Sequence, residues 1–146
     1  MRTTYQWLAR LIALAVVLQA AFIAFGTFEI FNAADDGRAF TADTAYNTGQ
    51  TLHSVFGMMV IPALALALLI VSFFAGIPGG ARIATLVLAL VGVQVLLGLV
   101  SFPAPWLGLL HGINAFVLAG VAGGLAGQRA GRALGAEPPT EAPSAP

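Results

Sequence analysis

The chain has 146 residues, enough for one domain, and its composition excludes an ordinary soluble protein. Hydrophobic residues make up 59% of it and charged residues only 8%, whereas a soluble domain carries about 25% charged residues. The formal net charge is zero, so we expect no basic surface for nucleic acid. Cysteine is absent, which excludes disulfides, thiolate metal sites, iron–sulfur clusters and covalently attached c-type haem.

Long apolar stretches predict an all-α membrane protein. A helix needs about 20 apolar residues to cross the hydrocarbon core of a bilayer. Stretches of this kind cover residues 11–31, 52–74, 83–102 and 106–127, and short breaks rich in Gly or Pro separate the last three. We therefore expect one domain, residues 1–134, that forms an antiparallel four-helix transmembrane bundle. Residues 135–146 are rich in Pro, Ala and Glu and should form a disordered cytoplasmic tail.

The arginines predict the orientation of these spans, because positively charged residues favour the cytoplasmic side. Five of the six fall on one side: Arg2, Arg10, Arg82, Arg129 and Arg132. The loop on the other side carries Asp35, Asp36 and Asp43, of which Asp43 is a candidate N-cap for the second helix. We expect a multi-pass protein of a bacterial plasma membrane with both termini in the cytoplasm. The first span is longer than the apolar part of a signal peptide, and no convincing cleavage site follows it.

Polar side chains inside the spans are candidates for function, because amide and ionisable groups are costly in hydrocarbon. They are Gln19, His53, Gln94, His111 and Asn114. The two histidines are the only ones in the chain. Both fall near the outer ends of their spans, at depths that differ by about 6 Å at 1.5 Å per residue. We expect Gln19 and Gln94 to form hydrogen bonds between helices.

Two imidazoles on neighbouring helices of a bundle are typical of haem b with two axial histidines. In this interpretation His53 and His111 are the metal ligands, and small and aromatic neighbours shape the pocket: Gly57, Gly112, Phe56, Phe116 and Asn114. Ligation by Met58 or Met59 in place of one histidine is an alternative. Two further interpretations stay open, namely histidines that hydrogen-bond at the membrane interface, and a site for proton transfer or another metal.

Residues 94–126, QVLLGLVSFPAPWLGLLHGINAFVLAGVAGGLA, resemble the third and fourth helices of a half-repeat of haem A synthase. That family has a Gln-x-x-x-Gly segment, a short outer turn with proline, and a helix with an axial histidine near its outer end. The matching residues here are Gln94, Gly98, Pro103, Pro105 and His111, and His53 falls where the family's other ligand of the pair lies. The chain is also similar to small bacterial four-helix proteins of the DUF6220 family. The first resemblance implies a half-bundle that binds haem.

Other positions depart from the haem A synthase pattern. The family places a glutamate three residues before the first histidine and an arginine just after it, and here these positions are Gln50 and Ser54. An amide cannot accept a proton in place of a carboxylate. The chain also has four predicted spans where most of the family has eight. We therefore expect no haem A synthase activity. An enzyme is the weakest of the interpretations, and a haem or quinone oxidoreductase is the form of it that stays open.

The leading functional hypothesis is a b-type cytochrome-like protein that transfers electrons, senses redox state or handles haem. A second hypothesis is a non-catalytic subunit or scaffold. It would pack into a respiratory or other membrane complex, or against a second copy, through glycine faces such as Gly108-x-x-x-Gly112 and Gly120-x-x-x-Gly124. A third is a small proton- or solute-conducting bundle, since polar residues in spans often line pathways. In each case the lipid bilayer is the expected surrounding, and nucleic acid is not an expected partner.

Overall fold

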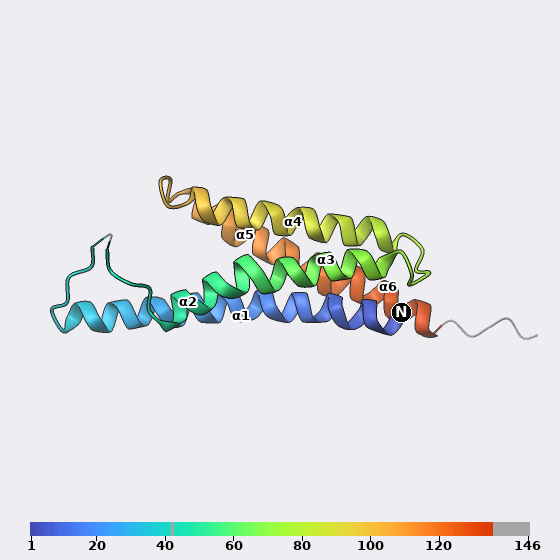
Figure 1. Ribbon diagram of the computed structural model, residues 1–146, viewed down its shortest axis with the longest axis horizontal. Helices are drawn as coiled ribbons and strands as arrows, with labels where there is room; N and C mark the ends of the chain where they lie inside the picture. Colours follow the sequence, from blue (N-terminus) through green and yellow to red (C-terminus); the bar gives the residue numbers. More distant parts are fainter. Residues whose placement is uncertain (42, 136–146) are drawn as a thin grey trace, which may run out of the picture.

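The computed structural model describes residues 1–41 and 43–135, which are mainly helical with no strand among them (Figure 1). The elements in chain order are α1 (Arg2–Asp35), α2 (Thr48–Val55), the π-helix η1 (Phe56–Val60), α3 (Ile61–Ser72), α4 (Gly80–Val100), α5 (Leu107–Ala119), the π-helix η2 (Gly120–Ala126) and α6 (Gly127–Gly135). The prediction of an all-α protein is confirmed. Gly135 ends α6, and the rest of the predicted tail, 136–146, lies outside the described residues.

Because α2, η1 and α3 are continuous, as are α5, η2 and α6, the chain forms four long helical rods. All four are long and apolar enough to cross a membrane: Arg2–Asp35, Thr48–Ser72, Gly80–Val100 and Leu107–Gly135. In each rod, only 17–22% of the most apolar window is buried within the protein. Such outward-facing apolar surface requires apolar surroundings, which supports the prediction of a multi-pass membrane protein. The first and last rods extend past the predicted spans, because the helix continues into the polar residues that flank them.

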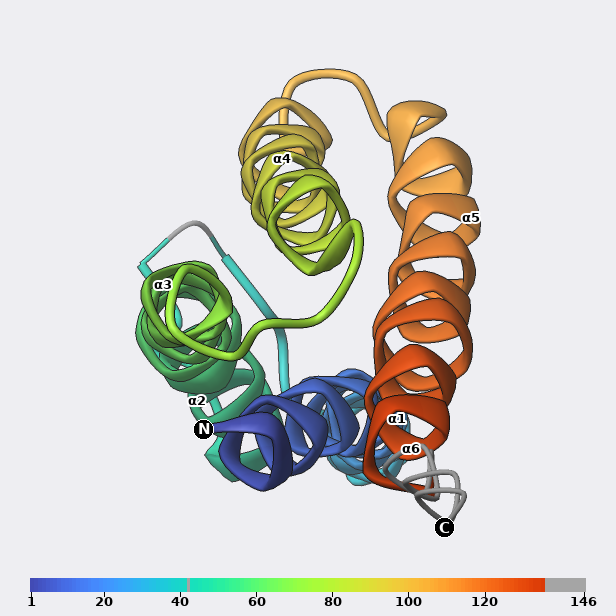
Figure 2. The same cartoon turned by 90° about the vertical axis from the view of Figure 1, so that its right-hand side faces the viewer.

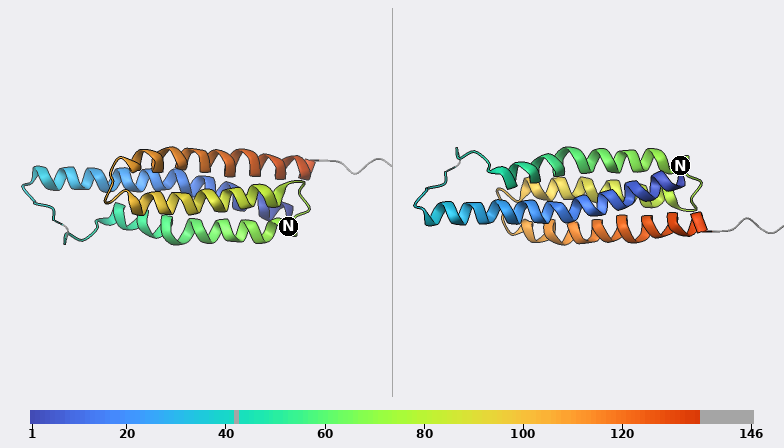
Figure 3. Two further views of the ribbon diagram at one scale, coloured as in Figure 1. Left: turned by 90° about the horizontal axis from the view of Figure 1, so that it is seen from above. Right: turned by 90° about the horizontal axis from the view of Figure 1, so that it is seen from below.

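The rods lie side by side around a common centre (Figures 1 and 2). The start of α1, the connection 73–79 and the end of α6 lie at one end, which we call the N-terminal end. The connections 36–47 and 101–106 lie at the opposite end, which we call the loop end. There α1 extends well beyond the other rods (Figure 3). α1 packs against α2, α3 and the last rod, and α4 packs against α3 and the last rod.

Most of the apolar core lies in the half of the bundle next to the N-terminal end, where all four rods contribute to it. The largest fully buried side chains are Tyr5, Ile12, Leu68, Val87 and Leu118. Arg2 adds polar contacts across this end, because its guanidinium donates hydrogen bonds to the carbonyl oxygens of Ala75, Gly76 and Ala133. These contacts join the start of α1 to the connection 73–79 and to α6.

Replacement of Tyr5 by phenylalanine tests this end of the core. The Tyr5 hydroxyl donates a buried hydrogen bond of 3.0 Å to the Gly80 carbonyl oxygen. Removal of the hydroxyl should lower the free energy of unfolding by about 1–2 kcal/mol, because the buried Gly80 carbonyl oxygen then loses a hydrogen-bond donor that water cannot replace. Thermal unfolding in detergent measures the change. Tyr46→Phe is the control, because Tyr46 is exposed and should change the midpoint by far less.

Asn47 and Gln50 cap the N-terminus of α2. The sequence had indicated Asp43 as the candidate for this role. The Gln50 N–H donates to the Asn47 side-chain oxygen at 2.9 Å, and the Asn47 N–H donates to Gln50 Oε1 at 3.1 Å. This reciprocal pair is a capping box. Asn47 also donates from Nδ2 to the Gly26 carbonyl oxygen of α1 at 2.7 Å. The prediction was wrong because Asp43 lies too far from the helix, whereas Asn47 also bonds to α1.

The second rod contains a π-helical turn, η1, close to Pro62. Proline has no N–H to donate and its ring disturbs the preceding turn of a helix. Here the wide turn η1 lies directly before Pro62, and the Ile61 N–H bonds to the carbonyl oxygen of Phe56. π-Helical turns of this kind occur often at functional sites.

Candidate functional site

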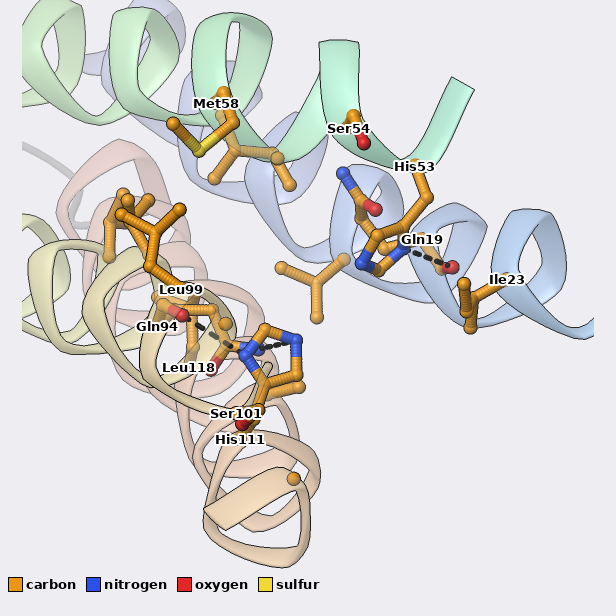
Figure 4. Close-up of a pocket in the computed structure, with 18 of the residues that line it drawn as sticks. Gln19, Ile23, His53, Ser54, Met58, Gln94, Leu99, Ser101, His111 and Leu118 are labelled. Atoms are coloured by element: carbon orange, nitrogen blue, oxygen red, sulfur yellow. Dashed lines mark hydrogen bonds between the residues drawn. The ribbon is translucent and has the colours of Figure 1, made fainter. Parts of the chain in front are cut away.

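A cavity of about 360 Å³ lies among the four rods toward the loop end. Most of its wall is apolar. The polar side chains that line it are Gln19 of α1, Tyr46 of the loop, His53 and Ser54 of α2, Gln94 of α4, Ser101 after α4, and His111 of α5. Its size and mainly apolar wall with a few polar groups are typical of a ligand site. Figure 4 shows the two histidines on opposite sides of this cavity.

His53 projects from α2 and is oriented by α1. Its Nδ1 lies 3.1 Å from the main-chain carbonyl oxygen of Gln19. A carbonyl oxygen only accepts, so Nδ1 carries the proton and Nε2 keeps its lone pair. Within residues 1–41 and 43–135, no hydrogen bond to this Nε2 is found. A main-chain carbonyl at Nδ1 is a common way to orient a metal-binding imidazole.

His111 is oriented in the same way by α4. Its Nδ1 donates to the main-chain carbonyl oxygen of Gln94 at 3.0 Å. Its Nε2 lies 3.1 Å from the Gln94 side-chain NH₂ and accepts from it. Asn114 fixes the direction of that amide, because its own NH₂ donates to Gln94 Oε1 at 2.6 Å and to the Leu90 carbonyl oxygen at 3.0 Å. Asn114 therefore acts on His111 through Gln94 and does not line the cavity.

Gly98 makes the approach of His111 to α4 possible. A Cβ atom at this position would lie 3.2 Å from Cε1 and 3.4 Å from Nδ1 of the imidazole. Such contacts are tighter than usual for a Cβ, so a larger residue would displace the ring. The glycine of the Gln-x-x-x-Gly pattern thus allows the ring to rest against the backbone of α4.

The structure brings the two imidazole rings together. Their centres lie 6.2 Å apart and their planes are inclined by 56°. The depth difference estimated from the sequence does not separate them. An imidazole nitrogen lies about 2 Å from a metal that it binds, so two imidazoles on opposite sides of one metal have ring centres about 6 Å apart. The observed separation matches that value.

Gln19 differs from the prediction that it forms a hydrogen bond between helices. Its side chain is only 8% exposed, yet neither amide atom has a hydrogen-bond partner among the described residues. The amide lies next to η1, where a Cβ at Gly57 would be 3.2 Å from Gln19 Nε2. A buried amide without partners costs about 1–3 kcal/mol, so such a group in a native protein calls for an explanation. Gln19 also lines the cavity, so its amide is a candidate donor and acceptor for a bound molecule.

The other predicted pocket residues divide into two groups. Gly57 lines the cavity, whereas Phe56 instead packs edge-on against Phe22 at 5.2 Å between ring centres. Phe116 is 82% exposed, and no atom lies within 4 Å of a Cβ at Gly112, so neither forms part of the cavity wall. The reason is the period of the helix. Gly108 lies three residues before His111 and Ala115 four residues after it, so both share its face of the helix and line the cavity. Gly112 and Phe116, one and five residues after His111, lie on other faces.

In the described part of the chain, the metal-binding nitrogen atoms that line the cavity are those of the two histidines. No cluster of three or more His, Cys, Asp or Glu side chains there could hold a bare metal ion. Two imidazoles suffice for haem, because the porphyrin supplies four nitrogens and the protein only the axial ligands. Comparison with models of protein families, with curated protein sequences and with solved structures found no match to this chain.

Proposed function

We propose that this protein is an integral membrane haem b protein with His53 and His111 as the axial ligands. The observation that carries the proposal is the pair of imidazoles 6.2 Å apart, each with its Nδ1 on a main-chain carbonyl oxygen. This arrangement leaves the Nε2 lone pair of His53 without a partner among the described residues, whereas the Nε2 of His111 accepts from the Gln94 NH₂. The expected resemblance of residues 94–126 to haem A synthase leads to the same proposal through the same residues, Gln94, Gly98 and His111.

The surroundings of the two rings fit such a group. The cavity has a mainly apolar wall, and three glycines on it, Gly57, Gly98 and Gly108, leave room beside the histidines. The Gln19 amide offers hydrogen bonds to a polar substituent. Ligation by His111 requires the Gln94 NH₂ to release Nε2, while the bond from Nδ1 to the Gln94 carbonyl continues to orient the ring.

The proposed role is electron transfer, redox sensing or haem holding rather than catalysis. A bound haem b supplies one-electron chemistry. No carboxylate lines the cavity in the part of the chain that the structure describes. Gln50, at the position of the haem A synthase glutamate, uses its side-chain oxygen to cap α2. Glu29 accepts a hydrogen bond from the Gly49 N–H outside the cavity. Once His53 and His111 bind a metal, the described lining of the cavity offers no carboxylate that would take a proton from a substrate.

In this proposal the rods form an antiparallel bundle across a bacterial plasma membrane, with the N-terminal end in the cytoplasm. The five arginines near that end support this orientation by the positive-inside rule. The described acidic residues, Glu29, Asp35, Asp36 and Asp43, all follow the apolar part of α1 or lie in the loop after it. The histidine cavity then lies in the outer leaflet.

The apolar core argues against the third hypothesis, a conducting bundle. Ala65, Leu68, Val87 and Ala122 are fully buried between the cavity and the N-terminal end. A water-filled path would need polar groups or open space at this level. The bundle here is close-packed and apolar.

An absorbance spectrum of the purified protein tests the proposal. Protein expressed with haem supply, or reconstituted with haemin, should show a Soret band and, after reduction, a sharp α band typical of two axial histidines. Met58→Leu should leave both bands unchanged, because the proposal assigns no ligand role to the methionine. A colourless protein that also fails to take up added haemin would overturn the assignment.

Gly98→Val should lower haem affinity by about 10–100-fold, which is the usual effect of disturbing the support of a metal ligand. The valine displaces His111 from α4, because even a Cβ at position 98 would crowd the ring. Gly92→Val on the same helix is the matched control, since no atom lies within 4 Å of a Cβ there. Haem titration followed at the Soret band measures both. Equal affinity in the two variants would contradict the role given to Gly98.

A further inference from the structure

A second cavity, of about 380 Å³, lies at the N-terminal end of the bundle, at the opposite end from the histidines. One wall comes from the first turns of α1 and the other from η2 and α6. Two arginines, two glutamines and three glycines line it, and no acidic side chain is among these residues. This composition is unlike that of the apolar histidine cavity.

Glycines at intervals of four form the floor of this cavity. A Cβ at Gly123 would lie 3.1 Å from the Ala13 Cβ, and one at Gly131 would lie 3.2 Å from Gln6 Nε2. Between them, Gly127 faces the Arg10 side chain, with a Cβ 3.9 Å from its Cγ. Glycine at these three positions lets α1 approach the last rod closely. The polar side chains beside this contact, Gln6, Arg10, Gln128 and Arg132, supply the groups that a ligand in the cavity would meet.

The charge of the cavity comes from Arg10 and Arg132. The neighbouring Arg2 and Arg129 instead donate to carbonyl oxygens of the connection 73–79, which orients their guanidinium groups toward that connection. Two guanidinium groups in one cavity, with the Gln6 and Gln128 amides beside them, form a donor set suited to a phosphate. Each guanidinium can offer two parallel N–H donors to phosphate oxygens.

Trp7 indicates the depth of this cavity in the membrane. Its side chain is 57% exposed, and the Arg10 guanidinium carbon lies 5.6 Å from the centre of its ring. Exposed tryptophans of membrane proteins gather at the level of the lipid headgroups. A cavity one turn along the same helix therefore faces headgroup phosphates, with Arg10 able to extend toward them.

From these observations we propose that the cavity between α1 and α6 binds a phosphate group, that of an anionic phospholipid in the adjoining leaflet. Basic pockets between transmembrane helices on the cytoplasmic side are suited to such headgroups. The glycine floor admits the headgroup, and Arg10 and Arg132 neutralise its charge. This inference does not depend on haem binding.

The test compares the full-length protein in nanodiscs of phosphatidylcholine alone and of phosphatidylcholine with phosphatidylglycerol. Phosphatidylglycerol should raise the unfolding midpoint of the wild type and remain bound after detergent exchange, as measured by mass spectrometry. The double variant Arg10→Gln/Arg132→Gln should lower phosphatidylglycerol affinity by about tenfold or more. The control Arg82→Gln, which matches each single variant Arg10→Gln or Arg132→Gln in charge, removes an exposed arginine next to the connection 73–79 and should retain the lipid.

Three further measurements decide between explanations. Inorganic phosphate and glycerol phosphate, added to protein in phosphatidylcholine, should raise the unfolding midpoint only slightly. If either compound raises it as much as phosphatidylglycerol does, the lipid assignment is overturned in favour of a soluble phosphate compound. Arg10→Lys/Arg132→Lys keeps the charge, and retention of lipid by this variant but not by the glutamine variant shows that the loss does not come from misfolding. If Arg82→Gln loses as much lipid as the double variant, the effect is general surface charge and the site is refuted.

Discussion

Alanine at His111 should lower the affinity for haem by more than about 100-fold, because even loss of an orienting partner of a ligand costs 10–100-fold. The remaining pigment should lose the sharp reduced α band, since only His53 would bind the iron. His53→Ala should have the same effect, because the two rings face one another at 6.2 Å and take equivalent roles. Haem titration and reduced-minus-oxidised spectra of both variants measure these changes.

Added imidazole separates loss of a ligand from loss of the fold. In either alanine variant the removed ring leaves space for free imidazole, which should restore the low-spin spectrum. Phe116→Ala is the matched control on α5, because its side chain is 82% exposed and does not line the cavity. If both histidine variants keep the wild-type spectrum, the axial assignment is wrong, whatever the protein binds.

Gly49→Ala should destabilise the protein by about 3 kcal/mol, at the upper end of the usual cost of overpacking. The N-terminal turn of α2 crosses α1 at Gly26, and a Cβ at Gly49 would lie 2.6 Å from the Gly26 Cα. The neighbour is backbone, so it cannot rotate away as a side chain would. The added methyl group should push α2 from α1 and break the Asn47 bond to the Gly26 carbonyl oxygen. Unfolding in detergent micelles, followed by circular dichroism, measures the loss.

The matched control for this variant is Gly112→Ala in α5, where no atom lies within 4 Å of a Cβ. Alanine favours a helix interior over glycine by up to about 1 kcal/mol, so this variant should be neutral or slightly more stable. Because α2 carries His53, Gly49→Ala should also weaken haem binding. A stable Gly49→Ala protein with unchanged unfolding would show that α1 and α2 do not meet at these glycines.

The site was only partly predictable from the sequence. Both histidines stood out because they are the only ones in the chain and lie within apolar spans, where ionisable groups are costly. Residues one helical turn away, such as Gly57, follow from the period of a helix. The prediction that Phe116 lines the pocket was wrong. It assumed that a residue close to His111 in sequence is also close to it in space, but Phe116 lies on another face of the helix. The carbonyl partners of the two Nδ1 atoms belong to other helices, so no local pattern indicates them.

By itself the sequence determined the helical rods, since length, apolarity and Gly/Pro breaks act locally along the chain and the bilayer sets the required span. It also determined that two imidazoles would lie in apolar surroundings. Only the tertiary structure decided that the rings meet at 6.2 Å and that Gln19 keeps a buried amide without a partner among the described residues. These features depend on how the rods rotate and cross. That is decided by close contacts between distant residues, such as Gly26 with Gly49 and Gly98 with His111.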